Sequence, residues 1–285
     1  MGGGVSIWTG ARDFGRMART MDTNPPDGAA PDAGAQAAAA KLKGVRGGGG
    51  SAARKYFALT YGPMPRWKAL LMELVVFLFS GTPGALGLFL RSKLYRPFFG
   101  ACGRKVVVGR HVTLRHPSKI RLGDGVVLDD NCVVDAKGDG NRGISIGDGA
   151  YVGRNTIVYC KGGDIEIGAN ASLSADCIVF SSNRLTLGAG TMVGSFSYLL
   201  SGGEYDWKSP VPFAEQSGME TKGPLEIGEN CWIGAHVTVL DAASIGPGTT
   251  VGAGAVVVSP LPPRCLALGV PARPVRERPP ETPSA

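Results

Sequence analysis

A period of six residues runs through the C-terminal half of this chain and restricts its fold more than any other feature. Large aliphatic residues occupy positions 227, 233, 239, 245, 251 and 257, and similar runs of three begin at residues 122, 146, 167 and 187. A less regular run precedes them, formed by Val108, Leu114 and Ile120. Neither the period of a helix nor the alternation of a flat strand gives a spacing of six. Runs of three predict triangular coils of three short strands, about 18 residues per coil, in a stack of about seven coils.

Two further positions of the repeat support this prediction. The residue four places after each aliphatic anchor is small, and Cys132, Cys177 and Cys231 occupy this position, so we interpret them as packing residues. The residue three places after the anchor is glycine or asparagine in most coils, which predicts a corner with positive φ. His111 and His236 occupy the same corner position, which favours a structural role for both.

The N-terminal part differs in composition. We expect residues 1–55, rich in Gly, Ala and Pro, to be a disordered tail, residues 56–103 to be an apolar helical segment, residues 104–278 to form the coiled domain and residues 279–285 to be flexible. Within 66–99, Glu73 and a Gly-Thr-Pro-Gly break interrupt the apolar run, so a spanning helix is not expected. Basic residues flank both sides, which favours a helical hairpin in the inner leaflet of a membrane. The alternative is two amphipathic helices packed on the main domain or on a neighbouring subunit.

Charge and cysteine content restrict the partners and the compartment. The formal net charge is +7, which fits an anionic membrane or a phosphate-bearing ligand. Nucleic acid is not expected as a partner, because no run of five or more Lys and Arg and no nucleic-acid motif occurs. The six cysteines include no C-x-x-C pair, which argues against a zinc ribbon. The first residues hold no apolar signal-peptide core, so we expect a cytoplasmic protein with reduced thiols, associated with the cytoplasmic face of the membrane.

Three C-terminal motifs carry a resemblance to a known family. Trp232-Ile233-Gly234, the segment Gly252–Val257 and the segment Gly269–Arg276 are similar to the end of hexapeptide-repeat acyltransferases, and in particular to bacterial acetyltransferases that modify sugars and polysaccharides. The period alone does not set the hand of the coil, but the resemblance implies a left-handed parallel β-helix. It also implies a homotrimer, acetyl-CoA as acyl donor in a groove between subunits, and a sugar or glycan acceptor in polysaccharide biosynthesis.

The resemblance also implies where the donor binds. The last coils would receive the pantetheine arm, and arginines after them would meet the nucleotide phosphates. The residues expected to bind the donor are Trp232, Gly234, Ala235, Gly252, Ala253, Arg264, Ala272 and Arg273. The glycines among them have an alternative role in the fold alone.

The general base is less clearly marked. Between Leu199 and Ile227 the repeat is interrupted by a long loop, and relatives place a His there that deprotonates the acceptor hydroxyl. This loop contains no His, so Glu204, Asp206 or the corner residue His236 is expected to be the base. The two carboxylates have an alternative role as solvated loop acids.

Two rival functions remain from the sequence. Carbonic anhydrases of this fold bind zinc through three His, and His111 and His116 have the spacing of two of them, but no third His lies nearby, so no metal is expected. The other rival is a non-catalytic scaffold or assembly protein that kept the fold and lost the catalytic His.

Overall fold

The computed structural model describes residues 51–203, 205–216, 218 and 220–279, all of which belong to one compact unit. Most of the predicted N-terminal tail, residues 1–50, lies outside the described residues, as do residues 280–285. The first described helix begins at Ala52, so helical structure starts inside the segment 1–55 that the composition assigns to the tail.

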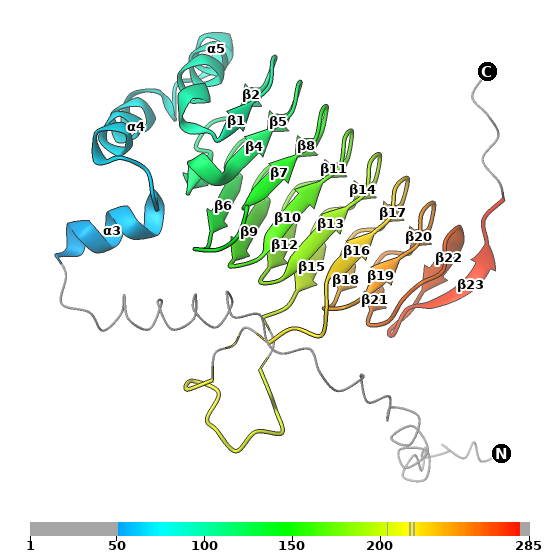
Figure 1. The fold of residues 1–285 in the computed structure, drawn as a ribbon. Helices are drawn as coiled ribbons and strands as arrows, with labels where there is room; N and C mark the ends of the chain where they lie inside the picture. Colours follow the sequence, from blue (N-terminus) through cyan, green and yellow to red (C-terminus); the bar gives the residue numbers. More distant parts are fainter. Residues whose placement is uncertain (1–50, 204, 217, 219, 280–285) are drawn as a thin grey trace, which may run out of the picture. The chain divides into compact units, whose positions relative to one another are not determined.

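Three helices precede the coiled domain (Figure 1). They are α3 (Ala52–Thr60), α4 (Arg66–Phe79) and α5 (Gly84–Leu94), and a short 3-10 turn, η2 (Arg96–Phe98), follows them. The side chain of Ser51 caps α3 by accepting the Arg54 N–H. Pro65 and Pro83 stand directly before α4 and α5, where a missing backbone N–H costs no helical hydrogen bond.

The rest of the chain forms three parallel sheets that run along a triangular stack of coils (Figure 1). Sheet A contains β1 (Ala101–Cys102), β4 (Ile120–Leu122), β7 (Ile144–Ile146), β10 (Asp164–Ile167), β13 (Arg184–Leu187), β16 (Leu225–Ile227) and β19 (Ser244–Ile245). Sheet B contains β2 (Val107–Val108), β5 (Val127–Leu128), β8 (Tyr151–Val152), β11 (Ser172–Leu173), β14 (Met192–Val193), β17 (Trp232–Ile233), β20 (Thr250–Val251), β22 (Cys265–Leu268) and β23 (Arg273–Glu277). Sheet C contains β3 (Thr113–Arg115), β6 (Val133–Lys137), β9 (Ile157–Lys161), β12 (Ile178–Ser181), β15 (Tyr198–Ser201), β18 (Thr238–Val239) and β21 (Val256–Val257). A 3-10 turn, η3 (Pro117–Lys119), lies between β3 and β4, and only β23 pairs antiparallel among the strands of the described chain. The predicted fold class, a left-handed parallel β-helix of about seven coils, is confirmed.

The three positions of the repeat behave as expected. The aliphatic anchors from Val108 to Val257 are buried, and so are the small residues in the second position, including Cys132, Cys177 and Cys231. Burial raises the pKa of the Cys132 thiol to about 12, as expected for a thiol that packs as a small apolar group. The corner residues have positive φ, from Gly125 at 69° to Asn230 at 54°.

The first run of anchors has a different register from the one expected. Ile120 and Leu122 both lie in β4, so Ile120 belongs to the second coil. The first coil is formed by β1, β2 and β3, and it pairs Cys102 with Leu122. The sequence hid this register because Cys102 is not aliphatic, whereas Ile120 is.

Most coils are longer than three steps of the repeat, and the extra residues all lie at one corner. Consecutive anchors keep the spacing of six at the corner between sheets A and B and at the corner between sheets B and C. At the corner between sheets C and A the spacing varies, from six residues between Val239 and Ile245 to 28 residues between Leu199 and Ile227. Because this corner alone varies in length, every long loop of the solenoid leaves from the same edge.

A substitution at a corner residue tests whether the third position of the repeat requires a positive φ. Asn170 has a φ of 55°, and its N–H donates to the Asp148 carbonyl at 2.7 Å. Asn170→Val should lower the free energy of unfolding by about 1–2 kcal/mol, because a β-branched residue is strained in this conformation. Asn170→Gly should change it by less than about 0.5 kcal/mol. Equal urea unfolding curves for the two variants would contradict the assignment.

Candidate functional site

The long loop after β15 is held at its base by a buried carboxylate. Asp241 is only 5% exposed and follows the end of β18, in the next coil. Its Oδ1 accepts the Gly202 N–H at 2.5 Å and the Thr221 hydroxyl at 3.1 Å, and its Oδ2 accepts the Lys222 N–H at 2.5 Å. Asp241 therefore joins the two ends of the loop, a role that the sequence analysis missed because an acid near the end of a strand resembles any exposed turn residue.

The described part of the loop has its own internal contacts. The Asp206 carboxylate accepts the Lys208 N–H at 2.9 Å, while the Gln216 amide bonds the backbone N–H and carbonyl of Asp206 at 2.9 and 3.0 Å. The Tyr205 and Phe213 rings meet edge to face, with centroids 6.0 Å apart. Asp206 thus shapes a turn of the loop, which is consistent with the solvated-acid alternative. Glu204 lies outside the described residues.

His236 has the corner conformation expected from the repeat. Its φ is 57°, and its imidazole stacks on the Phe196 ring of the preceding coil, with centroids 5.0 Å apart and planes 9° from parallel. This corner joins β17 of sheet B to β18 of sheet C, whereas the loop leaves from the corner between sheets C and A. Within one chain, therefore, sheet C separates His236 from Asp206.

A groove of about 640 Å³ lies on the outer face of sheet B, where the last coils end. Met192 and Trp232 lie side by side in register and are 58% and 60% exposed, and Thr250, Leu266 and Arg278 complete the lining. Large exposed apolar side chains around a groove are typical of a binding surface. Of the residues expected to bind the donor, Trp232 is the one that lines this groove.

Of the glycines expected to face the donor, Gly234 is also required by coil stacking. A Cβ on Gly234 would come within 2.6 Å of the Ala253 nitrogen, whereas a Cβ on Gly252 would meet only the end of the flexible Leu268 side chain. Gly234 and Ala235 therefore lie directly against Gly252 and Ala253 at the corner between sheets B and C. The structure supports their role in the fold, and none of these four residues lines the groove.

The arginines expected to meet phosphates lie on opposite sides of sheet B. Arg264 is a corner residue with a φ of 53° between sheets A and B, where it lines a second cavity of about 350 Å³ with Arg278. Arg273 pairs with Leu268 across the antiparallel strand at the other edge, beside the buried Ala272. The predicted donor residues are thus not one cluster. Arg278, which lines both cavities, was missed by the sequence analysis because it follows the family motif.

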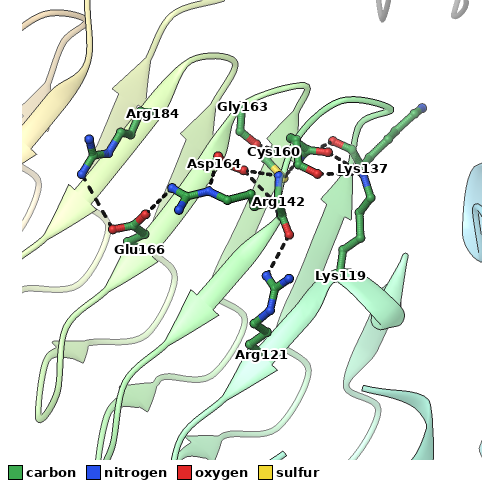
Figure 2. Close-up of polar contacts among 11 residues, drawn as sticks. Lys119, Arg121, Lys137, Arg142, Cys160, Gly163, Asp164, Glu166 and Arg184 are labelled. Atoms are coloured by element: carbon green, nitrogen blue, oxygen red, sulfur yellow. Dashed lines mark hydrogen bonds and ion pairs between the residues drawn. The ribbon is translucent and has the colours of Figure 1, made fainter. Parts of the chain in front are cut away.

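Sheet A has a third surface cavity, of about 510 Å³, but its charges are already neutralised (Figure 2). Arg142 contacts Asp164 at 3.2 Å and Glu166 at 2.6 Å, and these carboxylates raise the pKa of its guanidinium. Arg184 approaches Glu166 from the other side at 3.8 Å. The lining of the groove on sheet B includes Arg278, which donates to the Gly248 carbonyl at 3.0 Å.

The two remaining histidines lie in the first coil and contact the N-terminal helical segment. His111 donates its N–H to the Ser80 carbonyl, and His116 is buried with Nε2 3.3 Å from the Ala58 carbonyl and Nδ1 3.6 Å from Asp135. Across the described ranges, no group of three His, Cys, Asp or Glu side chains is arranged to hold a metal ion. Both histidines thus help to dock the helices on the first coils.

The repeat of the last coils matches a known family model. Residues 224–259, which contain Trp232 and His236, match the model described as bacterial transferase hexapeptide (six repeats). Among curated relatives, "Putative acetyltransferase SAR2635" of Staphylococcus aureus (strain MRSA252) is 35% identical over 43% of this chain and 60% of its own length. The galactoside O-acetyltransferase of Escherichia coli (strain K12) is 29% identical over 47% of this chain and 63% of its own length.

The chain therefore spans about three fifths of the length of these curated relatives. A solved structure, the maltose O-acetyltransferase from Clostridium difficile 630, is 21% identical, with 76% of this chain and 91% of that chain covered and a TM-score of 0.37.

Proposed function

We propose that this protein transfers an acetyl group from acetyl-CoA to a hydroxyl group of a sugar or polysaccharide precursor. The observation that carries the proposal is the groove on sheet B, lined by Trp232 and Arg278. His236 lies at the corner between sheets B and C, at the other end of β17 from the Asn230 corner. Trp232 and Thr250 of this groove lie within residues 224–259, which match the hexapeptide model, and both curated relatives are named as acetyltransferases.

The chemistry requires one proton transfer and one bond exchange. The acceptor oxygen attacks the thioester carbonyl carbon as its proton passes to a base, and the carbon–sulfur bond then breaks. The CoA thiolate takes that proton back from the base and leaves as the thiol. We assign the base to His236, because its imidazole is held in place by Phe196 and stands one residue from Ala235. Glu204 and Asp206 remain the alternative bases.

A homotrimer would bring the separated parts together. The middle coils of sheet C carry apolar side chains on the outer face: Ile178 is 38% exposed, and the Tyr159 and Phe180 ring centroids are 4.7 Å apart. Packing through such a face is typical of permanent subunit interfaces. In that arrangement the loop of one subunit and the His236 corner of its neighbour would border the same groove. We retain the expected cytoplasmic location and the expected contact of residues 66–99 with the inner leaflet.

Donor binding tests the assignment without knowledge of the acceptor. Arg264→Gln and Arg278→Gln should each weaken acetyl-CoA binding about tenfold in calorimetry, because each removes a charged hydrogen bond to phosphate. Arg184→Gln on sheet A is the matched control and should leave the affinity unchanged. No binding of acetyl-CoA to the unaltered protein would contradict the proposal.

The second candidate function is a non-catalytic scaffold. The absence of His from the sequence of the long loop favours it, since all three His of the chain lie at positions 111, 116 and 236. A scaffold would bind acetyl-CoA without transferring acetyl to any glycan, and the loop variants would then change no rate.

A further inference from the structure

Helix α4 has two apolar faces, of which only one is covered by the protein. Ala69, Met72 and Val75 are buried against the rest of the molecule. The opposite side, here called the outer face of α4, carries large exposed side chains at helical spacing. It consists of Trp67, Leu70, Leu71, Leu74, Phe77 and Leu78, with exposed fractions from 45% for Leu71 to 84% for Phe77.

Helix α5 contacts α4 (Figure 1) and also has exposed apolar side chains. Leu86 and Phe89 are 65% and 59% exposed. The buried Arg91 fixes the hairpin to the first coil: it donates to the Val108 carbonyl at 3.0 Å, to the Phe79 carbonyl at 3.2 Å and to the Thr82 carbonyl at 2.7 Å. The apolar surface is therefore held on the β-helix in a defined orientation.

Charge around this surface is almost entirely positive. Glu73 is the single acidic residue between positions 51 and 99, and it accepts hydrogen bonds from the hydroxyls of Tyr56 in α3 and of Tyr61, the residue after α3. Its charge is thus directed toward α3. Arg66 and Lys68 stand at the start of α4, and Lys93 lies over the Phe89 ring at 5.8 Å. An anionic surface would complement these cations.

The helices are too short to cross a membrane. α4 has 14 residues, and none of the helices in the part of the chain that the structure describes is long and apolar enough to span one. An apolar face rimmed by Lys and Arg on a short helix is the pattern of a helix that lies in the plane of the interface. A second copy of the chain is the less favoured occupant, because pairing two such faces would bring their cations together.

We propose that the outer face of α4, extended by α5, inserts into the interface of an anionic lipid bilayer and holds the β-helix at that surface. Trp67 and Phe77 enter the acyl boundary, while Arg66 and Lys68 contact lipid phosphates. Lipid binding itself does not depend on the proposed acetyl transfer.

Vesicle flotation of the full-length protein without acetyl-CoA tests this inference. Vesicles of phosphatidylglycerol and phosphatidylcholine should bind the unaltered protein. Trp67→Ser with Phe77→Ser should lower the partition coefficient about 100-fold. Arg66→Gln with Lys68→Gln should lower it about 30-fold on these vesicles and leave binding to pure phosphatidylcholine unchanged.

The matched control is Trp207→Ser with Phe213→Ser, a second exposed aromatic pair, 77% and 58% exposed in the loop. It should bind vesicles as the unaltered protein does. Circular dichroism should be the same for all variants, because each replaced side chain is exposed or half-buried. Failure of the unaltered protein to float, or equal binding by both aromatic variants, would overturn the proposal. So would a change in oligomer size that accompanies Trp67→Ser with Phe77→Ser without any change in lipid binding.

Discussion

Replacing His236 by asparagine is expected to lower kcat for acetyl transfer by about 100-fold or more, because general-base catalysis contributes that much in enzymes of this kind. Asparagine suits the backbone here, since Asn131 and Asn155 have the same corner position in earlier coils with φ of 61° and 57°. The variant should therefore fold normally and bind acetyl-CoA with unchanged affinity. Steady-state kinetics and calorimetry on the same preparation separate the two effects.

Substitutions of the two loop carboxylates test whether either of them is the general base. Glu204→Gln and Asp206→Asn should each retain activity within about tenfold of the unaltered protein, since a loop acid that only orders the backbone supplies no proton transfer. If His236→Asn is fully active and one of these loop variants is inactive, the base belongs to the loop and our assignment is wrong.

Replacing Asp241 by alanine is expected to release the loop from the β-helix. The carboxylate accepts bonds from Gly202, Thr221 and Lys222, so its loss leaves two backbone N–H groups near the core without an acceptor. The free energy of unfolding should fall by roughly 3 kcal/mol. Limited proteolysis should cut the variant within residues 203–220 much faster than the unaltered protein, and kcat/KM should fall even if acetyl-CoA still binds.

Asp130→Ala provides the control for this change. Asp130 also accepts a backbone N–H and an arginine, from Arg110 at 2.6 and 2.8 Å, but its side chain is 26% exposed. Water can replace those bonds, so the expected cost is about 1 kcal/mol or less, with no effect on loop cleavage. If the two variants lose the same free energy of unfolding, the burial of Asp241 does not add to the stability that its hydrogen bonds provide.

The repeat made the fold predictable because each of its three positions has a different structural requirement. Val251 must fill the coil interior, Ala255 must fit beside a corner, and Gly254 must adopt a φ of 71°. Each requirement restricts the residue type at its position, so the register of the coils could be determined from the sequence from residue 122 onward. It failed in the first coil, where Cys102 takes the anchor position and the helices, not another coil, cover the end.

The candidate site was less predictable, because its residues are brought together by stacking and not by spacing. Trp232 was found from its motif, but its neighbour Met192 lies in β14 of the preceding coil, before the long loop, and has no motif. Arg278 returns to the groove only because β23 runs antiparallel to β22. Likewise, Asp241 reaches back to Gly202 in the preceding coil, and no local pattern marks such a contact.

The most direct test of the proposed function is transfer of radiolabelled acetyl from acetyl-CoA to a panel of mono- and oligosaccharides by the purified protein. We predict label in at least one glycan, with equimolar release of free CoA, and loss of both signals in His236→Asn. Binding of acetyl-CoA with no label in any glycan, and no dependence of CoA release on His236, would contradict the account and favour the scaffold.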